Sequence, residues 1–397
     1  MKSRTALCLV LVLFLIAPLA FTQSKETGAI VGKVTDEEGS GLPGVTVTVA
    51  GPNLMGTRTT LTTPQGEYRI PALPPGEYTV KAELQGFQSL LQENVRLTTT
   101  TRLTIDFTLK QSAVEEQVTV IAQSPTVDIK STETASVTLT NELLRNIPYS
   151  QFTSEIVNMA PGVTPDNQGA SAYGAQEGTG IAYSMDGVNV ADPEGGTAWV
   201  FVDHNIIEEA KIMGVGLPAE YGNFTGVIFN VITKSGGNEF SGHMEFDYQG
   251  KKGDWPGGSF WQQDNNGDYI ADFPEFTNPV YKFYDANAHL GGPIKKDKIW
   301  FYQGFQFQHF EDYAAGFQGG PRAYDQPRSF TKITAQLTPS TNMMFGLEID
   351  TYNGENRGAS ATTAPEAVVG QKSPEVVGNF SLTHIFNSKT FIDVIAA

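Results

Sequence analysis

A regular alternation of apolar and polar residues narrows the fold of this chain more than any other feature, and it runs through the second half of the sequence. Phe305 and Phe307, for example, alternate with Gln306 and Gln308. The same pattern occurs in the segments 244–249, 284–290, 301–308, 343–350 and 379–383. A period of two gives a strand one apolar and one polar face. Aromatic-rich strands of this kind are typical of transmembrane barrels, although a soluble antiparallel sheet alternates too.

The start of the chain predicts a secretory signal peptide over residues 1–22. Lys2 and Arg4 precede the apolar run Ala6–Leu15, and small residues follow near a cleavage point. Cys8 is the single cysteine and would leave with this segment, so we expect a mature chain without disulfides or cysteine-based zinc sites. No later stretch reaches about 18 consecutive apolar residues. An exported chain without a spanning helix is either soluble or a membrane barrel.

The charge of the chain argues against a nucleic-acid partner. Its formal net charge is -17, from 26 Lys and Arg against 43 Asp and Glu. A protein that binds the phosphate backbone of a nucleic acid needs an excess of Lys and Arg instead. The five histidines do not have the spacing of metal ligands, and no serine has a partnered histidine and aspartate at readable spacing. We therefore predict that the protein is not an enzyme and requires no cofactor.

Short β-branched and aromatic runs between turns predict a small β-sandwich over residues 25–110. The expected strands are Gly28–Thr35, Val45–Ala50, Arg58–Thr62, Glu67–Ile70, Glu77–Glu83, Gln88–Leu97 and Arg102–Leu109. The phrases Gly66–Ile70, Leu73–Val80 and Gly86–Phe87 together resemble the carboxypeptidase regulatory-like domain. That resemblance implies a transthyretin-like sandwich that is an accessory module rather than a peptidase. Some relatives of this sandwich bind carbohydrate.

Residues 126–236 carry mixed helix and strand signals. In order, they are a helix beginning at Thr140 or Asn141, a hairpin over Tyr183–Val190 around an Asp-Gly turn, a strand at Ile206–Ile212 and the block Gly226–Gly236. This ordered series resembles the plug domain of TonB-dependent receptors. The resemblance implies an α+β plug followed by an outer-membrane β-barrel.

The alternating strands of residues 237–397 number six or seven by our count. Even eight strands enclose only side chains, whereas barrels with a plug have about 22 strands. We therefore expect this sequence to hold only the N-terminal part of an incomplete barrel. The phrases Leu290–Ile294 and Lys298–Tyr302 resemble the Oar-like subgroup of these receptors. We expect Trp300, just after a basic turn, to lie at a membrane interface, where indoles are favoured.

The predicted fold class is thus mainly β. It comprises an N-terminal transthyretin-like β-sandwich, an α+β plug domain and the first strands of a truncated transmembrane antiparallel β-barrel.

The polar connector 111–125 contains a run that can form a strand. Such a strand can add to the sheet edge of another protein through main-chain hydrogen bonds. By its position just before the plug it also resembles a TonB box, the segment that the energy-coupling protein grips. The residues concerned are Glu116, Gln117, Val118, Thr119, Val120 and Ile121. An ordinary linker strand is the alternative.

One acidic loop has the spacing of calcium ligands. Asp264, Asn266, Asp268, Asp272 and Glu275 occupy positions 1, 3, 5, 9 and 12 of an EF-hand-type loop, with the carbonyl of Ile270 at position 7. Position 6 is Tyr269 instead of glycine, and a solvated acidic loop is the alternative. If the loop binds calcium, calorimetry with calcium gives a heat of binding. No heat from the unaltered chain would contradict this prediction.

The resemblance implies a TonB-dependent receptor in the cell outer membrane of a Gram-negative bacterium, with its N-terminal domain in the periplasm. Expected partners are a TonB-type energy-coupling protein, outer-membrane lipid and an extracellular ligand. That ligand stays open among siderophore, oligosaccharide, peptide and cobalamin. The alternatives are an Oar-like adhesion or secretion-linked protein and a carbohydrate-binding surface protein.

Overall fold

A computed structural model gives the fold of the chain. It describes residues 27–54, 56–99, 101–111, 117–120, 126–127, 136–146, 156–166, 169–191, 196, 203–214, 225–249, 282–312, 314, 317, 319–360, 362–387 and 390–397. The predicted signal peptide, Glu116, Ile121 and the candidate calcium loop 264–275 lie outside the described residues.

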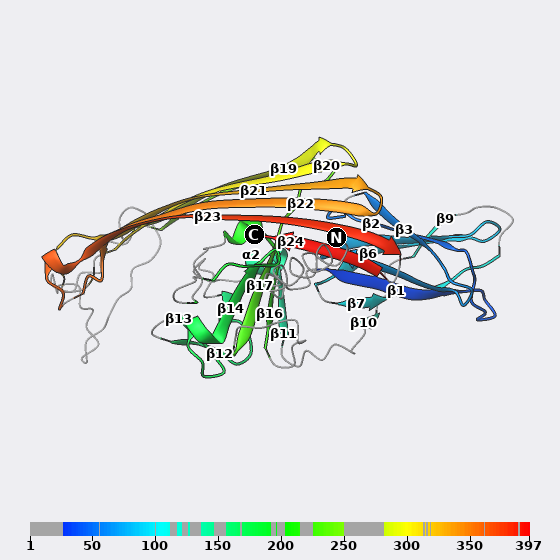
Figure 1. The fold of residues 1–397 in the computed structure, drawn as a ribbon, viewed down its shortest axis with the longest axis horizontal. Coiled ribbons are helices and arrows are strands. Elements are labelled where there is room, and N and C mark those ends of the chain that lie inside the picture. The colour runs from blue at the N-terminus through cyan, green and yellow to red at the C-terminus, as the bar shows by residue number, and fades with distance from the viewer. Residues whose placement is uncertain are drawn as a thin grey trace, which may run out of the picture.

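Two sheets packed face to face form the N-terminal sandwich (Figure 1). Its strands are β1 (Gly28–Thr35), β2 (Thr46–Ala50), β3 (Thr57–Leu61), β4 (Glu67–Leu73), β5 (Gly76–Glu83), β6 (Ser89–Leu97), β7 (Arg102–Thr104) and β8 (Phe107–Thr108). These bounds confirm six of the predicted strands to within a few residues, whereas the strand predicted over Arg102–Leu109 is two short strands, β7 and β8. Alternate residues turn inward, so Val47, Val80 and Leu97 are almost completely buried between the sheets.

The connector that follows contributes one short strand to each sheet of the sandwich. β9 (Gln117–Val120) pairs in parallel with β6 and ends the sheet ordered β3-β2-β5-β6-β9. β10 (Thr126–Val127) pairs antiparallel with β7 and ends the sheet ordered β10-β7-β1-β4.

An α+β domain comes next. Its elements are β11 (Ser136–Thr140), α2 (Asn141–Asn146), β12 (Val163–Asp166), β13 (Gly169–Ala172), α4 (Glu177–Gly180), β14 (Ile181–Met185), β15 (Val188–Asn189), η2 (His204–Ile206), β16 (Ile207–Met213) and β17 (Val227–Thr233). Five of them form a sheet in the order β11-β16-β17-β14-β15. Thr140 caps α2, because its hydroxyl accepts a hydrogen bond from the Leu143 N–H at 3.3 Å. The predicted Asp-Gly hairpin is confirmed, with Asp186 and Gly187 at φ 45° and 82°.

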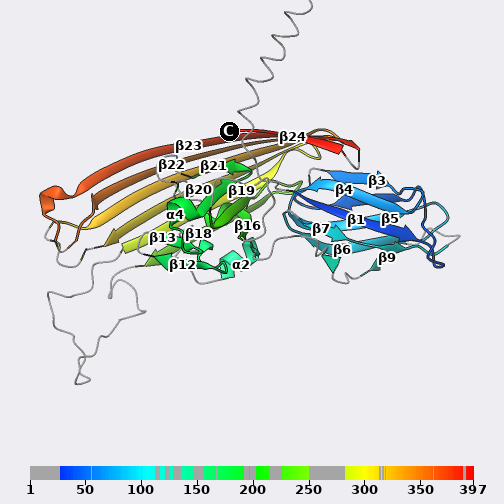
Figure 2. The same cartoon turned by 60° about the horizontal axis from the view of Figure 1, so that its bottom comes forward.

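The second half of the chain is a single antiparallel sheet that arches over the α+β domain (Figures 1 and 2). Its strands are β18 (Ser241–Gln249), β19 (Lys282–Lys295), β20 (Ile299–Asp312), β21 (Arg322–Thr338), β22 (Thr341–Arg357), β23 (Val369–Asn387) and β24 (Thr390–Ala396), with the short helix η3 (Pro365–Ala367) before β23. Each strand pairs with the next, and the sheet is not closed within the described residues. This confirms the predicted strand count.

The two faces of this sheet have reversed polarity compared with a water-soluble domain. On the outer face, Met244 is 82% and Phe305 54% exposed. On the inner face, Asp285, Gln308 and Asp350 are 0%, 1% and 3% exposed. Both predicted faces of the alternating strands are therefore present.

The prediction for Trp300 is wrong. Its position on β20 turns the side chain to the inner face, where it is 2% exposed. The indole N–H donates a hydrogen bond to Asn238 Oδ1 at 2.8 Å. The basic turn is present between β19 and β20, but the indole faces the interior because it shares the parity of the buried residues of β20.

Within the described part of the chain, no helix is both long and apolar enough to cross a lipid bilayer.

Candidate functional site

The candidate site is the contact between the inner face of the seven-stranded sheet and the α+β domain. Part of this contact is apolar, because Tyr302 and Phe330 of the sheet join the core of the α+β domain, which includes Ile206 and Phe229. The rest consists of buried polar and charged groups. These polar groups set the register in which the sheet covers the domain.

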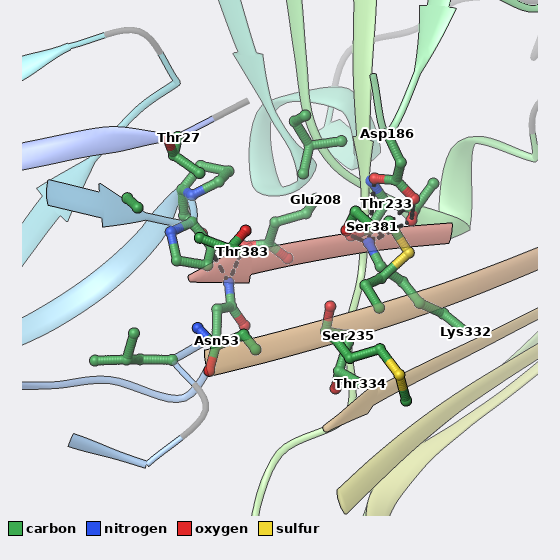
Figure 3. Close-up of a pocket in the computed structure, with 18 residues that line it drawn as sticks. Thr27, Asn53, Asp186, Glu208, Thr233, Ser235, Lys332, Thr334, Ser381 and Thr383 are labelled. Atoms are coloured by element: carbon green, nitrogen blue, oxygen red, sulfur yellow. Dashed lines mark hydrogen bonds and ion pairs between the residues drawn. The ribbon is translucent and has the colours of Figure 1, made fainter. Parts of the chain in front are cut away.

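A buried lysine of the sheet reaches the Asp-Gly turn of the α+β domain (Figure 3). Lys332 Nζ lies 3.1 Å from both carboxylate oxygens of Asp186 and donates to the carbonyl and hydroxyl oxygens of Thr233 at 3.0 and 2.9 Å. The backbone N–H of Thr233 donates to the same carboxylate at 3.0 Å, and its hydroxyl donates to the other oxygen. We call Asp186, Thr233 and Lys332 the lysine latch.

The position of each group in the lysine latch follows from local structure. Asp186 lies in the left-handed region that an Asp-Gly turn requires, which turns its carboxylate back toward the end of β17. Lys332 lies on β21 with the parity of the inward residues. A buried pair of this kind adds little net stability, but removal of one partner leaves an uncompensated charge. The latch therefore fixes where the turn meets the sheet.

A second polar contact surrounds Asp203, directly before η2. Its carboxylate caps η2 by accepting a hydrogen bond from the Asn205 N–H at 2.8 Å. The other oxygen lies 3.2 Å from His289 Nε2 on β19, and His204 Nδ1 lies 3.8 Å from the first. Burial opposes the charge of Asp203, but the nearby His289 and His204 imidazoles and the hydrogen bond from the Asn205 N–H outweigh it and lower the pKa of the carboxyl group.

Carboxamides and charges continue along the inner face of the sheet beyond these two contacts. Asp285 accepts hydrogen bonds from the side chains of Gln306 at 2.7 Å and Gln308 at 3.3 Å. Arg328 donates to Gln306 at 2.5 Å and lies 3.4 Å from Asp350. The inner face thus satisfies much of its polarity across neighbouring strands.

The N-terminal sandwich contacts the same α+β domain through β16. The backbone N–H and hydroxyl of Thr99 donate to Glu209 at 3.0 and 2.6 Å, and Lys211 donates to the Thr99 carbonyl at 3.2 Å. Burial raises the pKa of Glu209, although the hydrogen bonds from Thr99 act in the opposite direction. Beside this contact Asn53 donates to Glu208 at 3.0 Å, at the edge of a cavity of about 130 Å³ that the lysine latch also lines (Figure 3).

Comparisons with known proteins find similarities over parts of the chain. Residues 29–110 match the carboxypeptidase regulatory-like domain. Over 310 residues the chain is 32% identical to the TonB-dependent transporter Oar of Myxococcus xanthus, and the match covers 73% of this chain and 28% of that protein. The chain is similar to a TonB-dependent transporter. It spans 28% of the length of that relative.

Two solved structures are also similar. The siderophore receptor PirA of Acinetobacter baumannii is 16% identical, with a TM-score of 0.46, and the match covers 64% of this chain and 37% of that one. A mutant of the ferric enterobactin receptor of Pseudomonas aeruginosa is 17% identical, with a TM-score of 0.47, over 64% and 38% of the two chains.

Of the predicted site residues only Gln117–Val120 are described, and they do not lie at the contact between the plug-like α+β domain and the sheet. Gln117–Val120 form β9 on the regulatory-like domain, far along the chain from the lysine latch. The calcium prediction concerns residues outside the described ranges and stays a prediction. Among the described residues no group of three or more His, Cys, Asp or Glu side chains is placed to hold a metal ion.

The residues of the lysine latch and of the Asp203 contact were missed by sequence reasoning. The Asp-Gly turn and the polar face of each strand were both readable. The sequence did not indicate which charges of the sheet and of the plug-like domain pair with each other. Lys332 and Asp186, for example, are 146 positions apart.

The lysine latch predicts a large non-additive effect on stability. Lys332→Met leaves the Asp186 charge buried without its partner and should destabilise the contact by about 3–5 kcal/mol. Adding Asp186→Asn should restore most of that loss, because asparagine tolerates the left-handed turn and can still bond Thr233. Urea unfolding of the full chain in detergent measures both. Lys296→Met, in the exposed β19–β20 turn, is the control, and equal losses in the single and double variants would contradict the pairing.

The Asp203 contact predicts a loss of stability in acid. Burial lowers the pKa of His204 below its usual 6.5, although Asp203 opposes this shift. The unfolded chain then takes up a proton more readily than the folded protein, so stability falls as pH decreases from about 6.5 toward the lowered value. His204→Gln should flatten this slope, because the buried imidazole is then absent. Hydrogen exchange of residues 203–213 above and below pH 6.5 measures the effect, and an unchanged slope in His204→Gln would refute it.

Proposed function

We propose that this chain works within an outer-membrane TonB-dependent transporter that takes up an extracellular ligand. In this proposal the seven-stranded sheet lies in the outer membrane and the α+β domain is its plug. A TonB-type protein couples the inner-membrane proton gradient to movement of the plug. Similarity to a TonB-dependent transporter supports the class of protein.

The reversed polarity of the sheet is the observation that carries the proposal. Exposed aromatic and aliphatic side chains recur on the outer face of strand after strand, including Phe246 at 67%, Phe345 at 40% and Val376 at 68%. Contiguous apolar surface of this kind is unfavourable in water and favourable in lipid. The polar residues of the same strands lie against the plug-like domain. Lipid outside and a polar interior are the arrangement of outer-membrane barrels.

The two ends of the sheet support an orientation. Residues 296–298 join β19 to β20 and residues 339–340 join β21 to β22 by tight turns, at the end where Arg58 of the regulatory-like domain donates to the Pro339 carbonyl at 2.8 Å. The opposite end carries the longer connections 250–281, 313–321 and 358–368. Outer-membrane barrels have short periplasmic turns and longer extracellular loops. We therefore place the regulatory-like domain in the periplasm and the long connections outside the cell.

The coupling role is assigned to Glu116–Ile121. Its four described residues are extended and lie at the edge of a sheet, which is the conformation that strand addition by a partner needs. The segment also precedes the plug-like domain, whose first strand along the chain is β11. Deletion of residues 117–120 should abolish capture of the purified periplasmic domain of a TonB-type protein.

Charged substitutions on the two kinds of exposed surface test the membrane proposal. Phe305→Arg, in the middle of β20 on the outer face, should destabilise the membrane-inserted sheet by about 2–4 kcal/mol. Leu61→Arg, at a 63% exposed site on the regulatory-like domain, should change stability by less than about 0.5 kcal/mol. Folding of each variant into lipid vesicles, followed by urea titration, measures the difference. A Phe305→Arg variant as stable as Leu61→Arg, or a parent chain that stays in the aqueous phase, would defeat the proposal.

A further inference from the structure

The regulatory-like domain contacts both the plug-like domain and the large sheet, through two separate connections. Thr99, in the turn between β6 and β7, donates two hydrogen bonds to Glu209 on β16 of the plug-like domain. Arg58, on β3, donates from Nη1 to the Pro339 carbonyl in the turn between β21 and β22 of the sheet, at 2.8 Å. One domain therefore holds a strand of the plug-like domain and a turn of the sheet at the same time.

The connection to the sheet is closely fitted. A methyl carbon added at Gly56 would lie 2.5 Å from Gln336 Oε1 on β21, and Gly56 has a φ of 74°, which favours glycine. A methyl carbon added at Gly237, just before β18, would lie 3.4 Å from the Pro52 carbonyl oxygen. Arg58 itself is 5% exposed. The segment that runs from β2 into β3 therefore packs against the sheet at several points.

The connection to the plug-like domain is buried. Thr99 is 0% exposed, and Glu209 and Lys211 of β16 are 4% and 3% exposed. Lys211 Nζ donates to the Thr99 carbonyl at 3.2 Å, so Thr99 uses its N–H, its hydroxyl and its carbonyl in this contact. A buried carboxylate is costly unless donors satisfy it, and Thr99 supplies two of them to Glu209. The position of this turn on β16 is therefore specified by polar groups.

The regulatory-like domain, the plug-like domain and the sheet all line the cavity of about 130 Å³ described above (Figure 3). Asn53 lines it from the regulatory-like domain, Glu208 and Thr233 from the plug-like domain, and Thr334 and Ser381 from the sheet. The regulatory-like domain thus lies against the junction between the other two parts of the chain.

We propose that the regulatory-like domain is a clamp that ties the plug-like domain to the sheet. Its two ends are the Thr99–Glu209 contact and the Arg58–Pro339 contact, and the plug-like domain leaves the sheet only after one of them opens. The inference rests on the proposed function in one respect, because it takes the α+β domain to be a plug that moves. It assigns to the regulatory-like domain a docking surface whose partner is the rest of the same chain.

The chemistry of the two ends suits a tie that opens and closes. Both consist of hydrogen bonds to or from charged side chains, and water can take the place of either partner when the surfaces separate. A hydrogen bond of this kind changes an equilibrium constant by about tenfold or more. Loss of either end should therefore raise the population in which the plug-like domain is separated from the sheet, although the lysine latch remains intact.

The reactivity of a buried thiol measures this separation. Asn205 is 1% exposed, and its carbonyl accepts a hydrogen bond from the Tyr302 hydroxyl of the sheet at 3.5 Å. Asn205→Cys places a thiol of similar size at the contact between the plug-like domain and the sheet. In a Cys8→Ser background it is the single thiol of the chain. Its rate of reaction with a maleimide, measured on the full chain in detergent, reports how often the contact opens.

Two variants release the two ends of the clamp. Arg58→Met keeps the aliphatic stem and removes the guanidinium group, and Thr99→Val removes the hydroxyl and keeps the shape of the side chain. Each should raise the reaction rate of the Asn205→Cys thiol by about fivefold or more, because each removes hydrogen bonds from the closed state. Arg102→Met, at an exposed site on β7, is the matched control and should leave the rate within about twofold.

A second thiol separates the clamp from a general loss of stability. Val47→Cys, in the buried core of the sandwich, should stay equally unreactive in both variants. The clamp is disproved if either variant leaves the Asn205→Cys rate unchanged, since a tie fails when either end is released. It is also disproved if the Val47→Cys thiol accelerates as much as the Asn205→Cys thiol, because the sandwich would then be unfolding. These measurements need neither ligand nor coupling protein, so their failure leaves the proposed transporter to the Phe305→Arg test.

Discussion

The seven-stranded sheet depends on one constraint, which is that it buries charged side chains such as Asp285, Lys332 and Asp350 on its inner face. A buried charge without a partner is far more costly than a buried pair, so the elements under the sheet must supply partners at matching positions. Asp186 and Asp203 do so from a turn and a helix start, where backbone geometry fixes their direction. Lys332 and His289 meet them from two different strands of the sheet. The buried charges of the sheet thus determine where the plug-like domain must carry charges of opposite sign.

Much of the fold was predictable because its signals are local. The strands of the sandwich follow from short β-branched runs and the turns between them. The large sheet follows from the alternation of apolar and polar residues, which marks each segment as a strand whatever its register with its neighbours. The Asp-Gly hairpin and the Thr140 cap follow from chemistry within a few residues. These features need no knowledge of what lies across the molecule.

The site was not predictable for the opposite reason. From the sequence alone, Lys332 could pair with any of many carboxylates in the chain. Only the three-dimensional fold selects Asp186. Trp300 shows the same limit. Its position near the start of β20 was predictable from the sequence, but its hydrogen bond to Asn238 on the inner face was not. The pairing of β9 with β6 was equally hidden, since a short extended run carries no record of which sheet edge accepts it.

The kinds of contact that hold the plug-like domain differ in how easily they can be exchanged. Strand pairing and ion pairs are made of polar groups, and water can replace their partners when two surfaces separate. An apolar core offers no such replacement. In this chain the apolar part of the contact with the sheet includes Tyr302 and Phe330, whereas the lysine latch and the Asp203 contact are polar. The proposed function, in which a plug is held firmly and still moves, requires that balance.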